Sequence, residues 1–356
     1  MNTDESNIKS ETDLKVIAVG DILIGVEIRK LDGSVQEPVR KDPISAFPLV
    51  SSILKKADIV FGNLEHPLTD KGTPSMGRMF SWRASRRMVL ALTSGGFNLV
   101  NLANNHTMNY GPEGLMDTIE TLRANKIDYI GAGENISEAR KPVIIEKKGN
   151  RVAFMGYATN INQPFGFAAG DNKPGVAPVM VSPLYEPPHV NEESMEMMAE
   201  DIRNTRSLAD IVVVSCHWSL GLEAATSHTL AVHQRGVTHA AIDAGADLVL
   251  GHGPHLVQGI EVYKGKVIFY NLGQFVVDRE VPDIEKRNIM VHFEISNRQI
   301  ERVCFLPVLI NDKGQPQLLS AKDSDCHKIQ QLMEKLSRKL GTTLSFEGTE
   351  GRVHRG

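Results

Sequence analysis

The sequence predicts an α/β fold in which two β-sheets pack face to face between outer layers of helices. Short apolar runs of strand length each end abruptly in polar residues, and segments with helical spacing separate them. Further along the chain, paired apolar runs flank turn residues, which is typical of β-hairpins. The alternation of strands and helices favours a sheet buried on both faces, and the hairpins indicate a second, largely antiparallel sheet.

The individual elements follow from this pattern in chain order. Strands that end in polar residues are predicted at 14–19, 59–61, 97–102, 211–215 and 248–250. Helices are predicted where apolar residues recur at spacings of three, four and seven; these residues are Phe47, Val50, Ile53 and Leu54, then Leu115, Ile119 and Leu122, then Val237, Ala240, Ala241 and Ala244. Hairpin turns are predicted at 149–150, 264–265 and 297.

The two ends of the chain and one internal segment depart from this pattern. Residues 1–13 are polar, and we expect them to be disordered. The segment 161–193 is rich in glycine and proline and too long for a simple connection, which favours a lid or a surface insertion. We expect residues 311–356 to form a C-terminal extension with one amphipathic helix, at 323–340, followed by a frayed tail.

Composition narrows the range of functions. The chain has 356 residues, with 39 Lys and Arg against 43 Asp and Glu, for a net charge of -4. A nucleic-acid binder needs a positively charged face, so this class of partner is excluded. The sequence shows no secretory signal and no apolar run long enough for a membrane anchor. Cys216, Cys304 and Cys326 lack metal-binding spacing and indicate a reducing compartment, so we expect a cytoplasmic protein.

Unusual polar residues lie where the predicted strands end. In open α/β sheets the loops after the strands converge on one crevice, so we expect these residues to meet there; they are Asp21, Asn63, Glu65, Asn104, Asn105, His106, His217, His252 and His255. Carboxylates, amides and imidazoles are suited to one or two divalent cations such as Mn, Fe or Zn. Two such ions can bind a phosphoryl or carbonyl oxygen and activate a bridging water.

Two of these strand ends carry further information. Glycine and proline at 251–254 hold His252 and His255 in a tight turn, where two converging imidazoles would be costly without a partner. Cys216 directly precedes His217, and the alternation of a strand sends these side chains to opposite faces. We therefore expect Cys216 to be a buried thiol rather than a ligand.

Longer segments around these residues resemble, in the same order, those of a known family. They are GD at 20–21, FGNLEHPLT at 61–69, FSWRAS at 80–85, GFNLVNLANNHTMNYGPEGLMDT at 96–118, YIGAGEN at 129–135, VVVSCHWSLGLE at 212–223 and GADLVLGHGPHLVQGIEVYKGKVIFYNLGQF at 245–275. Together they are similar to the CapA family of capsule poly-γ-glutamate biosynthesis proteins, which has a calcineurin-like metallophosphoesterase fold. The resemblance spans about residues 14–306.

The resemblance implies a four-layer αββα sandwich over residues 14–310, with two mixed β-sheets flanked by helices. It also implies a set of metal ligands, namely Asp21, Glu65, Asn105, His217, His252 and His255. His106 would be the general acid or would stabilise a developing oxyanion. Arg83, in the matching FSWRAS segment, is the candidate for binding a substrate carboxylate or phosphate, together with Asn63 and Asn104.

The sequence also departs from the family pattern. Asp21 is followed by Ile22 and Leu23, whereas the wider superfamily has Asp-x-His here, so one imidazole of the first metal site is missing, as is usual in this family. Asn109 replaces the usual aspartate after the Asn-His pair, and Gly253 replaces a histidine. Each of these changes removes a charge or a ligand, and none adds one.

Three functions remain open at this point. The first is a metal-dependent hydrolase acting on an anionic small molecule or peptide, through a phosphoester or γ-glutamyl amide bond, in poly-γ-glutamate or capsule polymer metabolism. The second is a metal-free enzyme in which Asp21 and His255 form an acid/base pair, as in a peptide epimerase. The third is a non-catalytic accessory subunit of a polymer-synthesis complex. Many family members are membrane-associated, and a homo-oligomer is a further open alternative.

Overall fold

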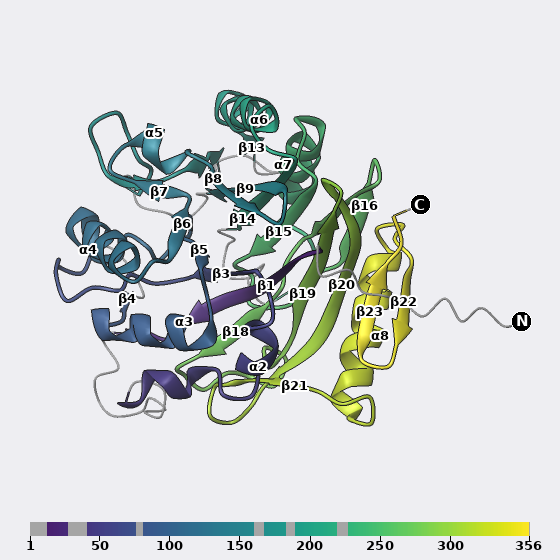
Figure 1. Cartoon of the computed structure of the whole chain (residues 1–356). Helices are drawn as coiled ribbons and strands as arrows, with labels where there is room; N and C mark the ends of the chain where they lie inside the picture. The colour runs from purple at the N-terminus through teal and green to yellow at the C-terminus, as the bar shows by residue number, and fades with distance from the viewer. Residues whose placement is uncertain are drawn as a thin grey trace, which may run out of the picture.

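The computed structural model describes residues 13–27, 41–75, 81–159, 167–182, 189–218 and 227–355. Within these residues two β-sheets pack against each other, and helices lie on their outer faces (Figure 1). We predicted that residues 1–13 are disordered. Residues 1–12 lie outside the described residues. Residues 161–166 and 183–188 of the predicted lid also lie outside them.

The larger sheet has the first strand of the chain near its centre. β1 (Leu14–Leu23) pairs in parallel with β3 (Ile59–Leu64) and, near its end, with β18 (Gln274–Val277), while its first half pairs antiparallel with β19 (Arg287–Ser296). The sheet continues on both sides of these strands, through β5 (Leu99–Asn101), β6 (Asp128–Ile130), β20 (Gln299–Ile310), β21 (Pro316–Leu318), β22 (Leu344–Glu347) and β23 (Glu350–Val353).

The smaller sheet is parallel at its centre. Its parallel strands lie in the order β9 (Asn150–Thr159), β14 (Ile211–His217), β15 (Leu248–His252) and β17 (Lys266–Phe269). Its outer strands are β8 (Val143–Lys147), β11 (Pro178–Val179) and β16 (Ile260–Tyr263). Short two-stranded pairs join β2 (Val26–Glu27) to β4 (Trp82–Arg83), β7 (Ala132–Gly133) to β10 (Gly175–Val176), and β12 (Val181–Ser182) to β13 (His189–Val190).

Helices connect and cover these strands. In chain order they are α2 (Ser51–Leu54), α3 (Val89–Gly95), α4 (Gly111–Ala124), α5 (Ile136–Ala139), α6 (Glu192–Arg206), α7 (Val232–Asp243) and α8 (Ser324–Arg338), with 3-10 turns at Pro43–Ala46 and Arg86–Met88. None of the helices in the described part of the chain has both the length and the apolar character needed to cross a bilayer.

Hydrophobic side chains fill the space between successive layers. Leu115 of α4 belongs to the cluster between α2–α4 and the larger sheet. Phe61 and Phe154 meet between the two sheets, with ring centroids 5.7 Å apart. Val237 of α7 packs on the outer face of the smaller sheet, in a cluster that α6 also joins. The layers are therefore helix, sheet, sheet and helix, which is the αββα sandwich expected from the sequence.

The predicted hairpins form, but they do not build a sheet of their own. β8–β9, β16–β17 and β19–β20 are antiparallel pairs. The β19–β20 hairpin extends the larger sheet beside β1, whereas the other two flank the parallel centre of the smaller sheet. The expectation of a second, largely antiparallel sheet is therefore wrong, because a turn signal specifies a pair of strands and not the sheet that they join.

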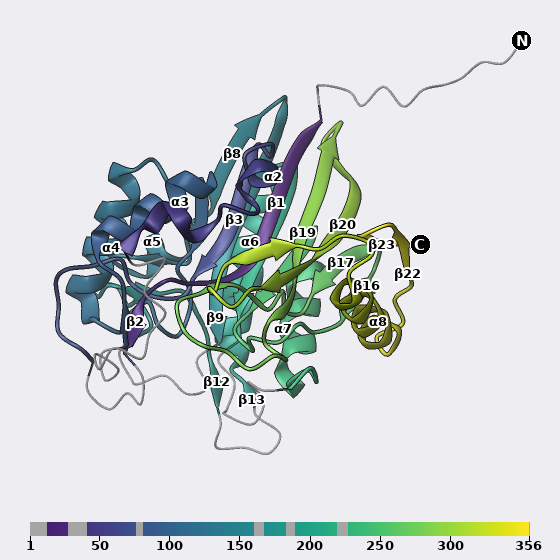
Figure 2. The same ribbon diagram turned by 90° about the horizontal axis from the view of Figure 1, so that it is seen from below.

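The C-terminal extension closes one side of the sandwich. Figure 2 shows α8 beside β16 and β23, and its buried residues Cys326, Ile329 and Met333 belong to the hydrophobic cluster between the sheets. The predicted helix is present. The frayed tail that we expected after it is instead the β22–β23 hairpin, which pairs with β20 and so is tied into the larger sheet.

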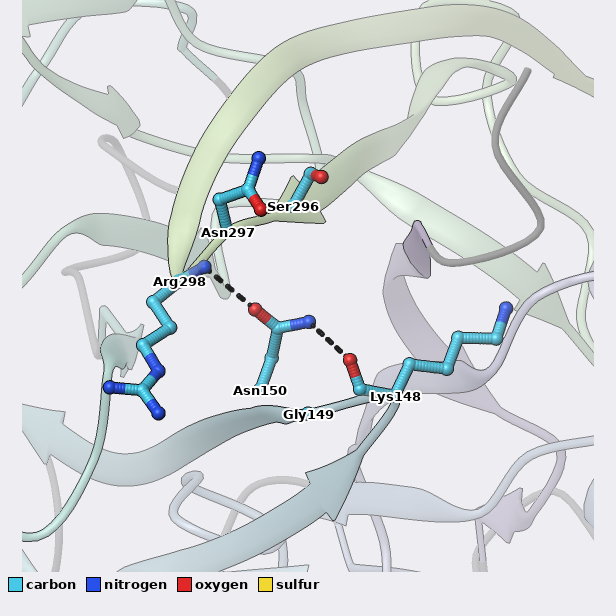
Figure 3. A pocket seen from close by; sticks show the side chains of 6 residues that line it. All are labelled: Lys148, Gly149, Asn150, Ser296, Asn297 and Arg298. Atoms are coloured by element: carbon cyan, nitrogen blue, oxygen red, sulfur yellow. Dashed lines mark hydrogen bonds between the residues drawn. The ribbon is translucent and has the colours of Figure 1, made fainter. Parts of the chain in front are cut away.

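The hairpin turns of the two sheets meet at one edge of the molecule. The Arg298 N–H donates a hydrogen bond to Asn150 Oδ1 at 2.9 Å, and Asn150 Nδ2 donates to the Lys148 carbonyl at 3.0 Å. Around these bonds lies a cavity of about 380 Å³ (Figure 3), which is lined by Lys148, Gly149, Asn150, Ser296, Asn297 and Arg298. Because β9 begins here, this edge is opposite the carboxyl ends of the parallel strands, where the sequence places the functional site.

Substitution in α8 tests whether the C-terminal extension is part of the core. Met333 is fully buried between the sheets, so Met333→Ala should lower the free energy of unfolding by about 2 to 5 kcal/mol. Lys335→Ala, on the exposed face of the same helix, should change it by less than about 0.5 kcal/mol. Urea denaturation followed by circular dichroism measures both. Equal effects of the two substitutions would show that α8 does not belong to the core.

Candidate metal centre

Asp21 lies at a bulge near the end of β1. The register of β1 shifts here against both β3 and β18. Gly20 approaches the backbone of β18 so closely that a Cβ atom at position 20 would lie 2.0 Å from the Gly273 oxygen. The Asp21 N–H donates to this same oxygen at 3.0 Å. The missing side chain of Gly20 thus lets the two strands meet, and Asp21 becomes completely buried.

The Asp21 carboxylate is contacted from both sheets. Asn63 Nδ2, from β3, donates to Asp21 Oδ1 at 2.8 Å, and the Gly253 N–H donates to Oδ2 at 3.2 Å. His252 Nδ1 lies 3.5 Å from Oδ1, and His255 Nδ1 lies 3.7 Å from Oδ2. Asn63 belongs to the larger sheet and the other three residues to the end of β15 in the smaller one. This carboxylate therefore links the sheets at their carboxyl edge.

Glu65 brings a second buried carboxylate to the same place. It directly follows β3 and is fully buried. His217 Nε2, at the end of β14, lies 3.3 Å from Glu65 Oε1, and His255 Nδ1 lies 3.9 Å from Oε2. Asp21, Glu65 and His255 each offer one ligand atom within 4.8 Å of the others. The structure thus brings together residues from four strand ends on two sheets.

The turn after β15 has an unusual backbone. Gly253 has a φ of 112°, and a Cβ atom there would lie 2.5 Å from the Trp218 carbonyl oxygen, so only glycine fits without rearrangement. His255 has a φ of 59°, which a residue with a side chain rarely adopts. Such backbone strain is concentrated at functional sites, where the surrounding structure compensates for it. Here it directs the His255 ring between the two carboxylates.

The pKa values of Asp21 and Glu65 are shifted in opposite directions by burial and by neighbouring charges. Burial alone would raise the pKa of Asp21, but the adjacent imidazoles of His252 and His255 outweigh it and hold this pKa well below its usual range. Burial raises the pKa of Glu65 to about 8, and the nearby negative charge of Asp21 adds to the rise. Near neutral pH, Asp21 is therefore ionised and Glu65 largely protonated when no cation is present.

The imidazoles are also shifted. Burial lowers the pKa of His217 to about 4 and lowers that of His252 as well, although Asp21 opposes the second shift. Burial would also lower the pKa of His255, but Glu65, when it is ionised, and the charge and proximity of Asp21 raise it above its ordinary value. His217 and His252 are therefore neutral at pH 7, which is the form that binds metals.

Several buried atoms in this cluster have unmet bonding capacity. Among the described residues, Glu65 Oε2, His252 Nε2 and His255 Nδ1 are buried without a hydrogen-bond partner. Buried polar atoms are normally satisfied, so each of them needs an explanation. The donor set of carboxylate oxygens and imidazole nitrogens is compatible with a divalent cation such as Mn, Fe or Zn. The residues present therefore fit a metal ion.

Asn63 and Asn104 are already engaged within the protein. Asn63 Oδ1 accepts hydrogen bonds from Asn101 Nδ2 at 2.9 Å and Asn104 Nδ2 at 3.3 Å. Asn104 Oδ1 in turn accepts from the backbone N–H groups of His106 and Thr107. Both side chains are fully buried. Their amides thus hold Asp21 and the loop after β5 in place, and the substrate-binding role of both residues stays a prediction.

His106 is connected to the segment that carries Arg83. Asn109 Oδ1 lies 2.8 Å from His106 Nδ1 and accepts a hydrogen bond from the Trp82 N–H at 2.8 Å. Arg83 is half-buried, and its guanidinium carbon lies 4.7 Å from the centroid of the Tyr110 ring, which is a cation–π contact. Asn105 is half-buried in the same loop. The metal-ligand role of Asn105 and the substrate-binding role of Arg83 stay predictions.

Arg279 is a functional candidate that our sequence analysis missed. Gln274, the first residue of β18, pairs with Asp21, and Arg279 follows the end of that strand. Its side chain is 26% exposed and lies 3.0 Å from Glu285 Oε2, and its positive charge acts on Glu65 and His255. The sequence contains the same pattern here as at the other strand ends, because apolar residues at 275–277 are followed directly by polar ones. The strand was overlooked because it is so short.

Two other residues near the cluster have structural roles. Cys216 packs among the residues under α6 and α7, while His217 faces Glu65, so the predicted alternation of these side chains is confirmed. His66 is fully buried and accepts a hydrogen bond from the Ile24 N–H at Nε2, at 3.0 Å. Burial lowers the pKa of His66 to about 4, so it is a neutral ring that holds the backbone directly after β1.

Comparisons with known proteins identify the family of this chain. The profile of the family described as bacterial capsule synthesis protein PGA_cap matches residues 15–279. The PGA biosynthesis protein CapA of Bacillus subtilis (strain 168) is 34% identical over 272 residues, which cover 76% of this chain and 65% of that protein. The capsule biosynthesis protein CapA of Bacillus anthracis is 30% identical over 315 residues, covering 88% and 71% of the two chains.

More distant similarities extend the comparison. A probable polyglutamine synthesis accessory protein of Mycobacterium tuberculosis is 28% identical over 290 residues, covering 80% of this chain and 73% of that one. A crystal structure of Chaetomium thermophilum Vps29 aligns with 86% of this chain and 94% of its own at 9% identity, but a TM-score of 0.31 carries no argument about function. From the matched profile and the two CapA relatives, the chain belongs to the PGA_cap family of bacterial capsule synthesis proteins.

Proposed function

We propose that this protein is a metal-dependent hydrolase that acts on an anionic substrate during poly-γ-glutamate or capsule polymer synthesis. The observation that carries the proposal is the buried cluster of Asp21, Glu65, His217, His252 and His255, with its unpaired ligand atoms. The names of the Bacillus relatives support the link to capsule polymer. The bond cleaved is a γ-glutamyl amide or a phosphoester.

The cluster supplies the ligands and Asn105 completes the set that we propose. A divalent cation held there would polarise a substrate oxygen and lower the pKa of a bound water. The protein contributes the rigidity of the site. Asn63 and the Gly253 N–H hold the Asp21 carboxylate in one orientation, and the strained turn fixes His255. Ligands that are held in this way need no rearrangement when the substrate arrives.

His106 is the proposed hydrogen-bond donor to the reacting oxygen. Because Asn109 Oδ1 accepts a hydrogen bond from the Trp82 N–H, this atom is the amide oxygen, and His106 Nδ1 must carry the proton that it shares with it. A neutral ring then has a lone pair on Nε2. To donate from Nε2 the ring must take up a second proton. The neutral amide of Asn109 stabilises the resulting positive charge less than the aspartate of the family pattern would at this position.

Two arginines are the proposed contacts for the negative charge of the substrate. Arg279 lies close enough to the cluster for its charge to act on Glu65 and His255, and its side chain is partly exposed. Arg83 is tied to the His106 loop through Asn109 and the Trp82 N–H. A guanidinium can bind a carboxylate or a phosphate through two parallel hydrogen bonds, so either substrate class is accommodated.

The two alternative functions differ in their support. A metal-free acid/base enzyme needs Asp21 and His255 on opposite sides of a substrate, but His255 Nδ1 lies 3.7 Å from Asp21 Oδ2, which leaves no room between them. A non-catalytic accessory role is favoured by one observation, namely that the Mycobacterium tuberculosis relative is named an accessory protein. This role remains the second candidate.

Metal removal tests the proposed function. Protein purified without chelator should contain Mn, Fe or Zn and should hydrolyse p-nitrophenyl phosphate or a γ-glutamyl oligomer, and dialysis against chelator should abolish turnover until the metal is restored. His252→Ala should lose metal from this site and turnover with it, because it removes a ligand. His239→Ala, on a histidine that pairs with Glu261 and stacks on Tyr263, is the matched control.

Elemental analysis and turnover are measured on the same samples. Turnover that survives in chelator would support the metal-free enzyme in place of our proposal. Fully metal-loaded protein that turns over neither probe would support the accessory subunit.

Substitution of His106 separates a chemical role from a structural one. His106→Ala should lower turnover by about 10²- to 10⁴-fold, the usual contribution of a positioned proton donor. Metal content and KM should stay near the wild-type values, because the interaction forms mainly in the transition state. Steady-state kinetics and elemental analysis check both. If His106→Ala released metal or unfolded the protein, His106 would be a ligand or a core residue.

Substitution of Arg279 tests recognition of the substrate's charge. Arg279→Gln should raise KM by about tenfold to a hundredfold, since a hydrogen bond to a charged group contributes about 1.5 to 3 kcal/mol. Arg287→Gln, which breaks an ion pair with Asp325 of α8, is the control and should leave KM unchanged. The comparison is made on the same anionic probe at low and high salt. An unchanged KM for Arg279→Gln would remove this residue from the substrate site.

A further inference from the structure

A second group of ligand-type side chains lies on the larger sheet. His292 on β19, Cys304 on β20 and Glu350 on β23 each offer one ligand atom within 4.8 Å of the others. His292 and Cys304 are direct cross-strand partners, and Cys304 is also paired with Arg352 of β23. Antiparallel pairing therefore brings together residues that lie far apart in the sequence. All three lie beyond residue 279, where the family profile ends.

The side chains of this group point towards a common space. His292 Nε2 lies 3.0 Å from Glu350 Oε2, yet among the described residues this buried nitrogen has no hydrogen-bond partner. A nitrogen and an oxygen at this distance without an aligned hydrogen bond are arranged as two ligands of a third atom would be. Cys304 is fully buried, and its sulfur lies within 4.8 Å of the ligand atoms of His292 and Glu350.

Arg302 supports the group without occupying that space. It donates to Glu350 Oε1, which leaves Oε2 facing His292, and its Nε donates to Cys304 Sγ at 3.2 Å. Hydrogen bonds of this kind orient metal ligands from outside the coordination sphere. Burial and the charge of Glu350 raise the pKa of Cys304 to about 11, so without a cation the group holds a neutral thiol and its net charge is zero. A cation would have to displace the thiol proton, and the ligand group with Arg302 would then carry a net charge of -1. A divalent cation would reverse that charge to +1, which a partly exposed site tolerates.

The group is reached from an adjacent cavity. A cavity of about 270 Å³ is lined by His292, Arg302 and Glu350 and also by Lys15 and Lys56. The cavity gives an ion a path to the ligands and room for a water molecule in a fourth position. One sulfur, one nitrogen and one oxygen ligand with an open position are typical of zinc and exclude magnesium and calcium, which take oxygen ligands.

We propose that His292, Cys304 and Glu350 form a second metal site, which binds Zn²⁺ or a cation of similar preference. It shares no residue with the cluster around Asp21 and is independent of the proposed function. The presence of a thiolate makes it distinguishable from that cluster, whose ligands are oxygen and nitrogen alone.

Cobalt(II) titration of the full chain tests this site. Co²⁺ replaces Zn²⁺ in such sites, and a cobalt–thiolate bond gives a charge-transfer band in the near ultraviolet that oxygen and nitrogen ligands do not give. We expect one thiolate band that saturates at one equivalent for this site and is lost on addition of Zn²⁺. Cys304→Ser should lack the band, whereas Cys326→Ala, at a buried thiol in α8, should keep it.

Two further variants keep the test decisive. Asp21→Asn should retain the band, since it alters only the other cluster. His292→Ala changes a residue that is partly exposed, so it should fold even if Cys304→Ser does not, and it should weaken Co²⁺ binding at the thiolate by at least about tenfold. No thiolate band in the wild-type protein, or a band that persists in Cys304→Ser, would overturn the proposal and leave a hydrogen-bonded group without a metal.

Discussion

The structure depends on the burial of one carboxylate, that of Asp21. A buried charge is costly unless it is paired and hydrogen-bonded, so the surrounding chain must supply partners in a fixed arrangement. Asn63 supplies one from the larger sheet, and Gly253, His252 and His255 supply the others from the smaller sheet. The two sheets therefore cannot slide at this edge without exposing an unpaired charge. The bulge at Gly20 and the strained turn at His255 both serve this arrangement.

Much of the cluster was predictable because one rule covers it. Polar residues directly after a buried parallel strand meet at one edge, and this rule identified Asp21, Glu65, His217, His252 and His255 without knowledge of the pairing. The alternation of Cys216 and His217 followed from strand geometry in the same way. Arg279 was missed because β18 has only four residues, and its parallel pairing with β1 depends on contacts that no local pattern contains.

The errors have a related physical cause. The hairpins were found from their turns, but their assignment to sheets depends on which hydrophobic face they cover, and that is decided by the rest of the fold. The same holds for the tail after α8, whose hairpin is stabilised by pairing with β20. Cys304 lacks any metal-binding spacing in the sequence, and only the antiparallel pairing of β19, β20 and β23 brings it to His292 and Glu350.

The different acidity of the two carboxylates bears on how the cluster would accept a cation. Without one, Asp21 carries the negative charge and Glu65, with a pKa of about 8, is mostly protonated at pH 7. The pKa of Glu65 is raised but still lies near neutrality, so a nearby positive charge can remove this proton at neutral pH. A bound cation favours the ionised form of Glu65, so cation binding releases this proton below about pH 8. The affinity of the cluster for a cation should therefore fall as the pH falls. The chain thus keeps its buried charge low without a metal, yet holds a second carboxylate that a cation can ionise at small cost.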